Sequence, residues 1–174
     1  MTTLLRTVAD CARILPFEQA VVIGDSALQR GVDLGALGDA VRGGTPRGRR
    51  KALTVLESLE PATESVGESR TRLLLKRLGF ESPAAQFELS TPAGAFRADF
   101  AWPELMVIVE FDGDGKYRNH GPAADVLAAE RRRESLLMEQ GWVLVRLRWA
   151  DLDRPAEVRR RIEAAIATAA RRIA

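Results

Sequence analysis

The chain has 174 residues, with 26 Lys and Arg against 24 Asp and Glu, so its formal net charge is only +2. This balance excludes binding through a strong global basic field, and no apolar run approaches the roughly 20 residues of a transmembrane helix. A single cysteine, Cys11, excludes an internal disulfide. Because the start of the chain also lacks the layout of a secretory signal, we expect a cytoplasmic protein without a membrane partner.

Basic residues nevertheless gather locally. The range Arg42–Lys51 holds five basic residues and no acidic one, and further arginines cluster at Arg131–Arg133 and Arg159–Arg161. The planar guanidinium group suits phosphate, which favours a nucleic acid partner. Solvated helix faces are the alternative, and they are the preferred interpretation of the clusters taken alone. The carboxylates described below shift the balance towards nucleic acid.

Residues 1–62 are predicted to form a small all-helical segment. Apolar residues recur at helical spacing, Pro16 suits the first turn of a helix, and Asp33 can cap another helix. Pro46 and three glycines mark a loop over residues 43–48. The expected helices cover about residues 3–14, 16–30, 33–43 and 49–59.

From Ser65 the pattern changes to helix, three strands, helix, strand and helix. The third strand is apolar on both faces over Met106–Val109 and is therefore expected to be central. This order predicts an α/β (α+β) domain over residues 63–174, with a mixed four-stranded sheet flanked by helices. The expected strands cover about residues 85–89, 95–101, 105–112 and 142–149, and the expected helices about 65–78, 122–141 and 155 onward.

Two acidic residues end the third predicted strand. Since residues two apart in a strand share a face, Glu110 and Asp112 lie on the face of Ile108. A tight turn centred on Pro103-Glu104 would pair Asp99 with Ile108. Asp99 would then be the diagonal neighbour of Glu110, about 7 Å away at Cβ.

Carboxylates held side by side repel each other, and proteins tolerate them when a cation neutralises their charge. Oxygen ligands favour Mg²⁺ or Mn²⁺ over zinc. Asp99 and Glu110 are therefore candidate metal ligands. The alternative is that Glu110 and Asp112 merely enter solvent where the strand ends.

The stretch Arg97–Leu105 followed by Val109–Gly113 resembles the PD-(D/E)XK nuclease superfamily, specifically the bacterial endonuclease-domain proteins related to very-short-patch-repair endonucleases. The resemblance covers about Ser65 to Leu152. It implies a restriction-endonuclease-like fold, metal-dependent phosphodiester hydrolysis with Mg²⁺ or Mn²⁺, and DNA as the partner. Further matching pieces are Glu68–Arg70, Gly115–Tyr117, Ala129–Glu134, Gly141-Trp142 and Val143–Leu152.

Carried onto this sequence, the resemblance implies that Asp99 and Glu110 hold the metal. Asp112 stands where the superfamily often has a catalytic lysine, and it is a candidate third ligand. Lys116 is a candidate for the displaced positive charge, with an ordinary loop lysine as the alternative. His120 is more simply interpreted as a loop residue without function.

Glu68, on the helix before the strands, corresponds to an outer ligand or a water-positioning group. The alternative is local, because Ser65 and Glu68 have the spacing of a capping box. We keep both interpretations.

Four arginines are candidate contacts to DNA phosphates. Arg131 and Arg132 follow the loop after the third strand, and Arg49 and Arg50 belong to the basic run of the helical segment. For the first two, salt bridges with the neighbouring Glu130 and Glu134 are the alternative. The candidate catalytic residues are thus Glu68, Asp99, Glu110, Asp112 and Lys116.

The helical segment resembles the middle region of bacterial proteins that join a winged-helix, antitoxin-like module to such a domain. The matching residues lie within 5–10, 15–16 and 25–31. The winged helix would precede Met1, so the resemblance implies a helical support or linker rather than a reader of DNA sequence.

Three functions remain open. The first is a Mg²⁺-dependent DNA endonuclease, which the pair of Asp99 and Glu110 favours. The second is a nuclease-fold DNA-binding or regulatory module that has lost cleavage, which the missing lysine at Asp112 favours. The third is a purely structural partner domain, in which the acidic residues have no role. The sequence is also compatible with a homodimer.

Overall fold

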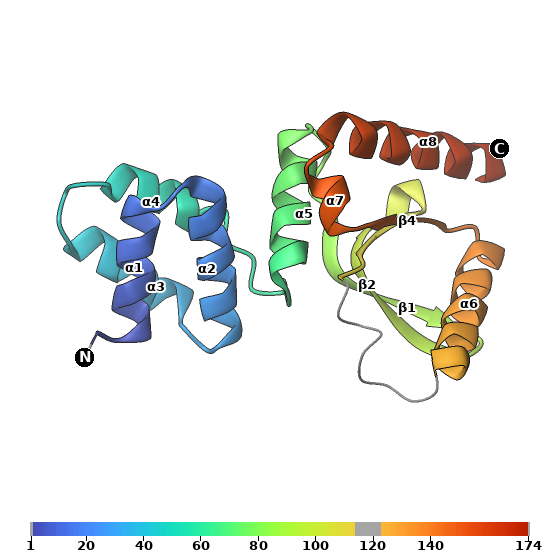
Figure 1. The fold of residues 1–174 in the computed structure, drawn as a ribbon, viewed down its shortest axis with the longest axis horizontal. Coiled ribbons are helices and arrows are strands. Elements are labelled where there is room, and N and C mark those ends of the chain that lie inside the picture. The colour runs from blue at the N-terminus through green and yellow to red at the C-terminus, as the bar shows by residue number, and fades with distance from the viewer. Residues whose placement is uncertain (1, 114–122, 174) are drawn as a thin grey trace. The chain divides into compact units, whose positions relative to one another are not determined.

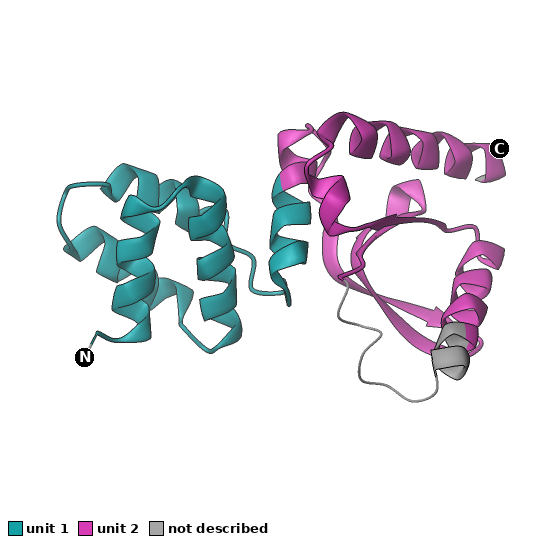
Figure 2. Cartoon of the chain, in the orientation of Figure 1, with its two compact units in different colours: residues 1–73 teal, residues 74–174 magenta. Residues whose placement is uncertain are grey.

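The chain folds into two compact units, Met1–Leu73 and Leu74–Ala174 (Figure 2). The structure is a computed structural model that describes residues 2–113 and 123–173. It is a mixed α+β protein with a four-stranded sheet, which confirms the predicted class (Figure 1). The expected domain limit between residues 62 and 63 stays a prediction, because helix α5 (Val66–Arg77) contributes to both units.

The first unit is helical, as predicted. Two of its helices begin at capping residues: Thr3 Oγ1 accepts a hydrogen bond from the Arg6 N–H at 3.3 Å, and Asp33 Oδ1 accepts one from the Ala36 N–H at 2.7 Å. Apolar side chains of all four helices before α5 form its buried core. These helices are α1 (Leu4–Ile14), α2 (Phe17–Gln29), α3 (Leu34–Gly43) and α4 (Arg49–Leu56).

Gly48 precedes α4 in a position that only glycine fills without strain. Its φ is +73°, and a Cβ there would lie 2.8 Å from the Arg13 carbonyl oxygen. We therefore expect Gly48→Ala to lower the free energy of unfolding by about 2 kcal/mol, since left-handed backbone alone costs about 1–2 kcal/mol. Urea unfolding measures the change. The control is Gly43→Ala, where a Cβ meets nothing within 4 Å, and an equal loss in both variants would contradict the explanation.

The second unit is built on a sheet with the strand order β1-β2-β3-β4. The first three strands are antiparallel neighbours, whereas β3 and β4 are parallel, so the chain crosses over through α6 between them. No helix in the described part of the chain combines the length and apolar character needed to cross a membrane. The elements are β1 (Ala84–Thr91), β2 (Gly94–Trp102), the 3₁₀ turn η1 (Pro103–Leu105), β3 (Val107–Phe111), α6 (Ala123–Glu139), β4 (Val143–Leu147), α7 (Trp149–Leu152) and α8 (Pro155–Ile173).

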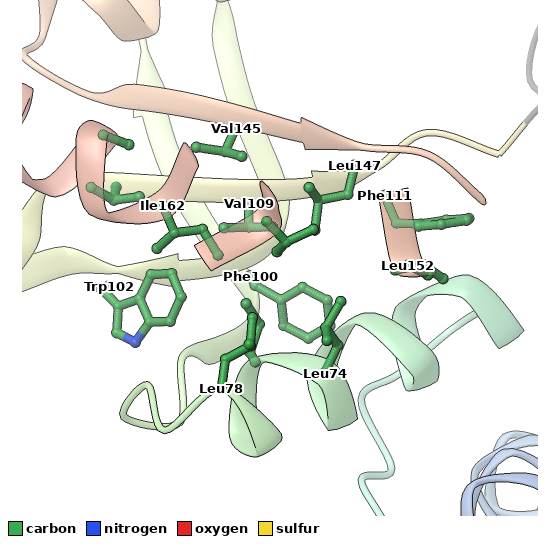
Figure 3. Close-up of a cluster of buried hydrophobic side chains, with 14 of the residues drawn as sticks. Leu74, Leu78, Phe100, Trp102, Val109, Phe111, Val145, Leu147, Leu152 and Ile162 are labelled. Carbon is green, nitrogen blue, oxygen red and sulfur yellow. The ribbon is translucent and has the colours of Figure 1, made fainter. Parts of the chain in front are cut away.

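Apolar layers cover both faces of this sheet. On one face, Phe100, Val109 and Leu147 pack with side chains from the end of α5, from α7 and from α8 (Figure 3). On the other face, Ile108 packs with Leu137 of α6. Strand β3 is buried on both faces, which confirms its predicted central place.

The turn between β2 and β3 is longer than predicted. It consists of η1 and Met106, whose φ of 53° is left-handed, so Trp102 pairs with Val107. The predicted tight turn centred on Pro103-Glu104 would pair Trp102 with Leu105, so the predicted register is wrong by two residues. The physical reason is that a 3₁₀ turn closed by a left-handed residue needs two more residues than a tight two-residue turn.

Candidate active site at the end of the central strands

The backbone of β1 is distorted between the pairs Ala85–Phe100 and Phe87–Ala98 of the β1–β2 ladder. Gln86, which lies between these pairs, has a left-handed φ of 50°. In β2, Ala98 and Ala101 both join the apolar layer under α6, although residues three apart in a regular strand face opposite sides. Left-handed backbone at a residue other than glycine costs about 1–3 kcal/mol and often occurs at functional sites. The distortion therefore marks Asp99 as an unusual position in the sheet.

The Asp99 carboxylate is fixed beside the end of β3. Phe100 of β2 pairs with Val109 of β3, and extending this register by one residue sets Asp99 opposite Glu110. The predicted pairing of Asp99 with Ile108 is therefore wrong by two residues, the length added by the turn. Asp99 Oδ2 accepts a hydrogen bond from the Phe111 N–H at 2.8 Å. The Phe111 N–H thus donates to a side-chain oxygen, whereas in a regular antiparallel ladder it would donate to a backbone carbonyl of β2.

Glu110 lies beside Arg146, its register partner on the parallel strand β4. Arg146 Nε is 3.5 Å from Glu110 Oε2. The same guanidinium contacts two carboxylates of α6, with Nη2 3.1 Å from Glu130 Oε1 and Nη1 3.4 Å from Glu134 Oε2. All four side chains are between 20% and 32% exposed, so water screens these charges less than it would on an open surface.

Arg146 keeps its positive charge in this environment. Burial by itself would lower the pKa of Arg146, but Glu134, Glu130 and Glu110 together raise it above its ordinary value. One guanidinium faces three carboxylates, so the cluster carries excess negative charge.

Asp112 follows β3, and its backbone continues the pairing with β4. Its N–H donates a hydrogen bond to the Leu147 carbonyl at 2.8 Å. The carboxylate is 14% exposed, and its Oδ2 lies 3.7 Å from Arg148 Nε. Next to it, Phe111 contacts Trp149 edge-on, with ring centroids 4.8 Å apart. The backbone of this strand end is therefore fixed from both sides.

Asp99, Glu110 and Asp112 thus lie near one end of β3, and all three offer carboxylate oxygens. Within residues 2–113 and 123–173, no three His, Cys, Asp or Glu side chains form a group that could hold a metal ion. Mg²⁺ commonly needs only one or two protein carboxylates, because waters and substrate phosphates complete its coordination. The pair Asp99 and Glu110 therefore fits Mg²⁺ by its chemistry, and the assignment of these ligands stays a prediction.

Two residues named from the sequence, Lys116 and His120, lie outside the described residues. The expected positive charge from Lys116 stays a prediction. In the described part of the chain, Arg146 on β4 contacts Glu110, and Arg148, directly after β4, contacts Asp112.

Glu68 belongs to the first unit, where it is 7% exposed and caps α5. Ser65 Oγ accepts a hydrogen bond from the Glu68 N–H at 3.1 Å, and Glu68 Oε2 accepts one from the Glu64 N–H at 2.9 Å. The serine half of the predicted capping box is confirmed, whereas Glu68 accepts from the N–H of Glu64 in place of that of Ser65. A role for Glu68 at the carboxylates stays a prediction.

The four candidate phosphate contacts differ in exposure. Arg131 and Arg132 of α6 are exposed, and so is Arg50 of α4. Arg49 is half-buried and donates a hydrogen bond to the Gly44 carbonyl at 2.8 Å, so it also supports the loop before α4. Glu130 and Glu134, the alternative partners of the α6 arginines, contact Arg146 (Nη2 and Nη1, 3.1 and 3.4 Å).

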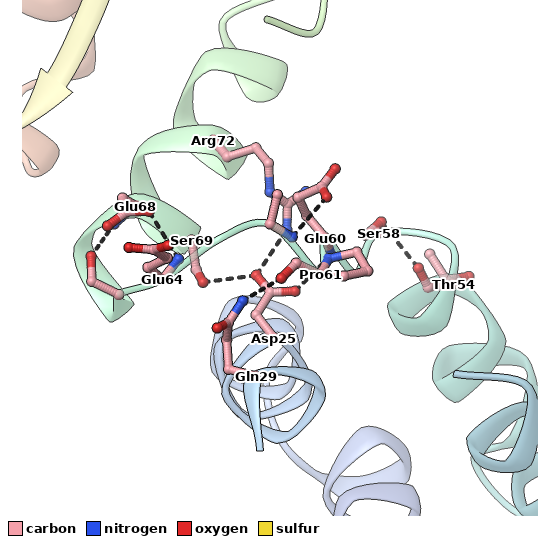
Figure 4. A network of polar contacts seen from close by, with 12 residues as sticks. Asp25, Gln29, Thr54, Ser58, Glu60, Pro61, Glu64, Glu68, Ser69 and Arg72 are labelled. Carbon is pink, nitrogen blue, oxygen red and sulfur yellow. Dashed lines mark hydrogen bonds and ion pairs between the residues drawn. The ribbon is translucent and has the colours of Figure 1, made fainter. Parts of the chain in front are cut away.

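A buried polar network in the first unit, centred on Asp25, was not predicted from the sequence (Figure 4). Asp25 is 1% exposed. Its carboxylate accepts hydrogen bonds from the Glu60 N–H at 2.8 Å and the Ser69 hydroxyl at 2.7 Å, and Arg72 Nη2 lies 2.9 Å away. A buried acid on an otherwise apolar helix face was the signal in the sequence that could have revealed it.

Against models of known families, curated proteins and solved structures, the chain shows no match.

Proposed function

We propose that the second unit is a Mg²⁺-dependent DNA endonuclease with a restriction-endonuclease-like fold. The observation that carries the proposal is the bond from the Phe111 N–H to Asp99, which fixes one carboxylate opposite Glu110 at the end of two central strands. The order of helix, three strands, helix, strand and helix is that of the nuclease superfamily that the sequence resembles. DNA is the proposed partner, and Mg²⁺ or Mn²⁺ the proposed cofactor.

Asp99 and Glu110 would hold the cation, and waters and a substrate phosphate would complete its coordination, since the described residues form no three-ligand group that includes Asp112. When bound, such a cation lowers the pKa of a water and neutralises charge on the phosphate. The protein contributes a carboxylate whose orientation is fixed before the cation arrives, because a backbone N–H holds Asp99. The apolar layers on both faces of β3 keep this end of the sheet rigid.

Arg131 and Arg132 would contact DNA phosphates, since both are exposed on α6, the helix whose Glu130 contacts Arg146. We expect Arg131→Ala and Arg132→Ala each to weaken binding similarly on unrelated DNA sequences. Each should also reduce the slope of log affinity against log salt concentration by about 1. Fluorescence anisotropy over a salt series measures both effects. Arg160→Ala, which breaks an exposed pair with Glu157 on α8, is the control, and an equal reduction there would contradict the assignment.

The second candidate function is a nuclease-fold regulatory module that binds DNA without cleaving it. The contact between Arg146 and Glu110 favours it, because a guanidinium already neutralises one of the two proposed ligands. Asp112 in the usual position of the lysine favours it as well.

A cleavage time course separates the two functions. Purified wild-type protein is incubated with supercoiled plasmid and with single-stranded DNA, in Mg²⁺, in Mn²⁺ and in EDTA. Cleavage that needs the divalent cation supports the endonuclease. Retained DNA binding without cleavage on either substrate supports the regulatory module. Loss of both binding and cleavage would contradict both functions.

A further inference from the structure

Arg146 is the shared counter-ion of three glutamates that come from two elements of the fold. Glu110 belongs to β3, and Glu130 and Glu134 are one helical turn apart on α6. The shortest contact is to Glu130 at 3.1 Å, followed by Glu134 at 3.4 Å and Glu110 at 3.5 Å. The guanidinium is therefore shared between α6 and β3, and its contact to Glu110 is the longest of the three.

This geometry lets Arg146 release Glu110 without losing its other partners. A guanidinium has five N–H donors in a planar arrangement, so contacts to the α6 pair and to Glu110 use different edges. If Glu110 turns to another cation, Glu130 and Glu134 still neutralise Arg146. The cost of the exchange is small, because no buried charge is left without a partner.

We infer that Arg146 is a positioning residue that neutralises Glu110 in the metal-free protein and competes with the divalent cation for it. The inference rests on the proposed function, since it takes Glu110 as a metal ligand. Two features of the contacts support the competition. Arg146 and the divalent cation would both bind the carboxylate of Glu110, and the positive charge of Arg146, 3.5 Å from Glu110 Oε2, would repel the divalent cation. The carboxylates of α6 set the balance, because they draw Arg146 away from Glu110.

The test is a calorimetric titration of Mn²⁺ into the full-length protein without DNA, together with the melting temperature at each Mn²⁺ concentration. Arg146→Gln should bind Mn²⁺ about tenfold more tightly than wild type, a size of effect common for residues next to metal ligands. Its melting temperature should be lower without metal and should rise more with Mn²⁺. Arg160→Gln removes the same charge from an exposed pair on α8 and should bind Mn²⁺ as wild type does.

A second variant tests the same balance with the opposite sign. Glu134→Gln leaves Arg146 with fewer partners on α6, so Arg146 should hold Glu110 more firmly and Mn²⁺ should bind more weakly. Glu139→Gln removes the same charge from an exposed position of α6 and should have no effect. Because Glu134 is 30% exposed, this variant decides the question even if Arg146→Gln does not fold.

The outcomes separate the inference from the proposed function. Tighter binding by Arg146→Gln supports the competition, and if that variant does not fold, weaker binding by Glu134→Gln than by Glu139→Gln supports it. If wild type binds Mn²⁺ and Arg146→Gln binds it with equal or weaker affinity, the inference is overturned, whereas the proposed metal site is retained. If neither wild type nor any variant binds Mn²⁺, both the inference and the proposed function are overturned.

Discussion

Asp99→Asn should lower the rate of DNA cleavage by about 10³-fold in Mg²⁺ or Mn²⁺. A catalytic metal contributes several kcal/mol to the stability of the transition state, and each 1.36 kcal/mol corresponds to a factor of ten in rate. Asparagine keeps an oxygen that accepts the hydrogen bond from the Phe111 N–H, so the strand end is preserved. The substitution removes only the negative charge that would bind the cation.

Plasmid nicking under single-turnover conditions measures this effect, with circular dichroism as the check of folding. Glu110→Gln should give a loss of similar size, because the two carboxylates act on one cation and such losses are not additive. Asp39→Asn is the control, since Asp39 forms an exposed pair with Arg42 in the first unit. Cleavage at the wild-type rate in Asp99→Asn would show that the activity comes from another site or from a contaminant.

The second large effect concerns stability. Asp25→Ala should lower the free energy of unfolding of the first unit by about 3–5 kcal/mol, the usual cost of removing one partner of a buried ion pair. The side chain of Arg72 is only 15% exposed and would lose its carboxylate. The Glu60 N–H and the Ser69 hydroxyl would lose their acceptor at the same time (Figure 4).

Urea unfolding followed by circular dichroism measures the loss, and Asp39→Ala is the matched control. The ion pair of Asp39 with Arg42 is exposed, so its removal should change stability by less than about 1 kcal/mol. Similar losses in the two variants would contradict the role assigned to the buried network.

Much of the fold could be predicted from the sequence because local signals and tertiary packing agree. Asp33 is a capping residue in both the prediction and the structure, and Gly79, with φ of +77°, follows the end of α5 where a stop was expected. The alternation of apolar residues gave the strands, and the apolar run over Met106–Val109 indicated the buried central strand.

The connection between β2 and β3 could not be predicted to the residue. A Pro-Glu pair is compatible with a tight turn and also with a 3₁₀ turn, and the choice depends on the left-handed Met106 that closes it. Because a shift of two residues preserves the alternation of faces, Asp99 and Glu110 still share a face as predicted. Glu110 is therefore opposite Asp99 rather than diagonal to it, as the register extends.

Of the candidate site, the sequence predicted the carboxylates but not the arginine that contacts Glu110. Asp99 and Glu110 could be identified because both stand in strands, where a charged residue is unusual. Arg146 was missed, although it interrupts the apolar alternation between Val145 and Leu147. Its role depends on the parallel register of β3 and β4, which pairs Arg146 with Glu110, 36 positions earlier in the chain (146 − 110 = 36). No local pattern encodes such a pairing.

The most direct test of the account is whether the carboxylates bind a divalent cation at all. Calorimetric titration of Mn²⁺ into wild type, Asp99→Asn and Asp39→Asn measures this without DNA and without any cleaving contaminant. The account predicts that wild type and Asp39→Asn bind with the same affinity and that Asp99→Asn binds at least about tenfold more weakly. Equal affinity in all three proteins would contradict the assignment of Asp99 to a metal site.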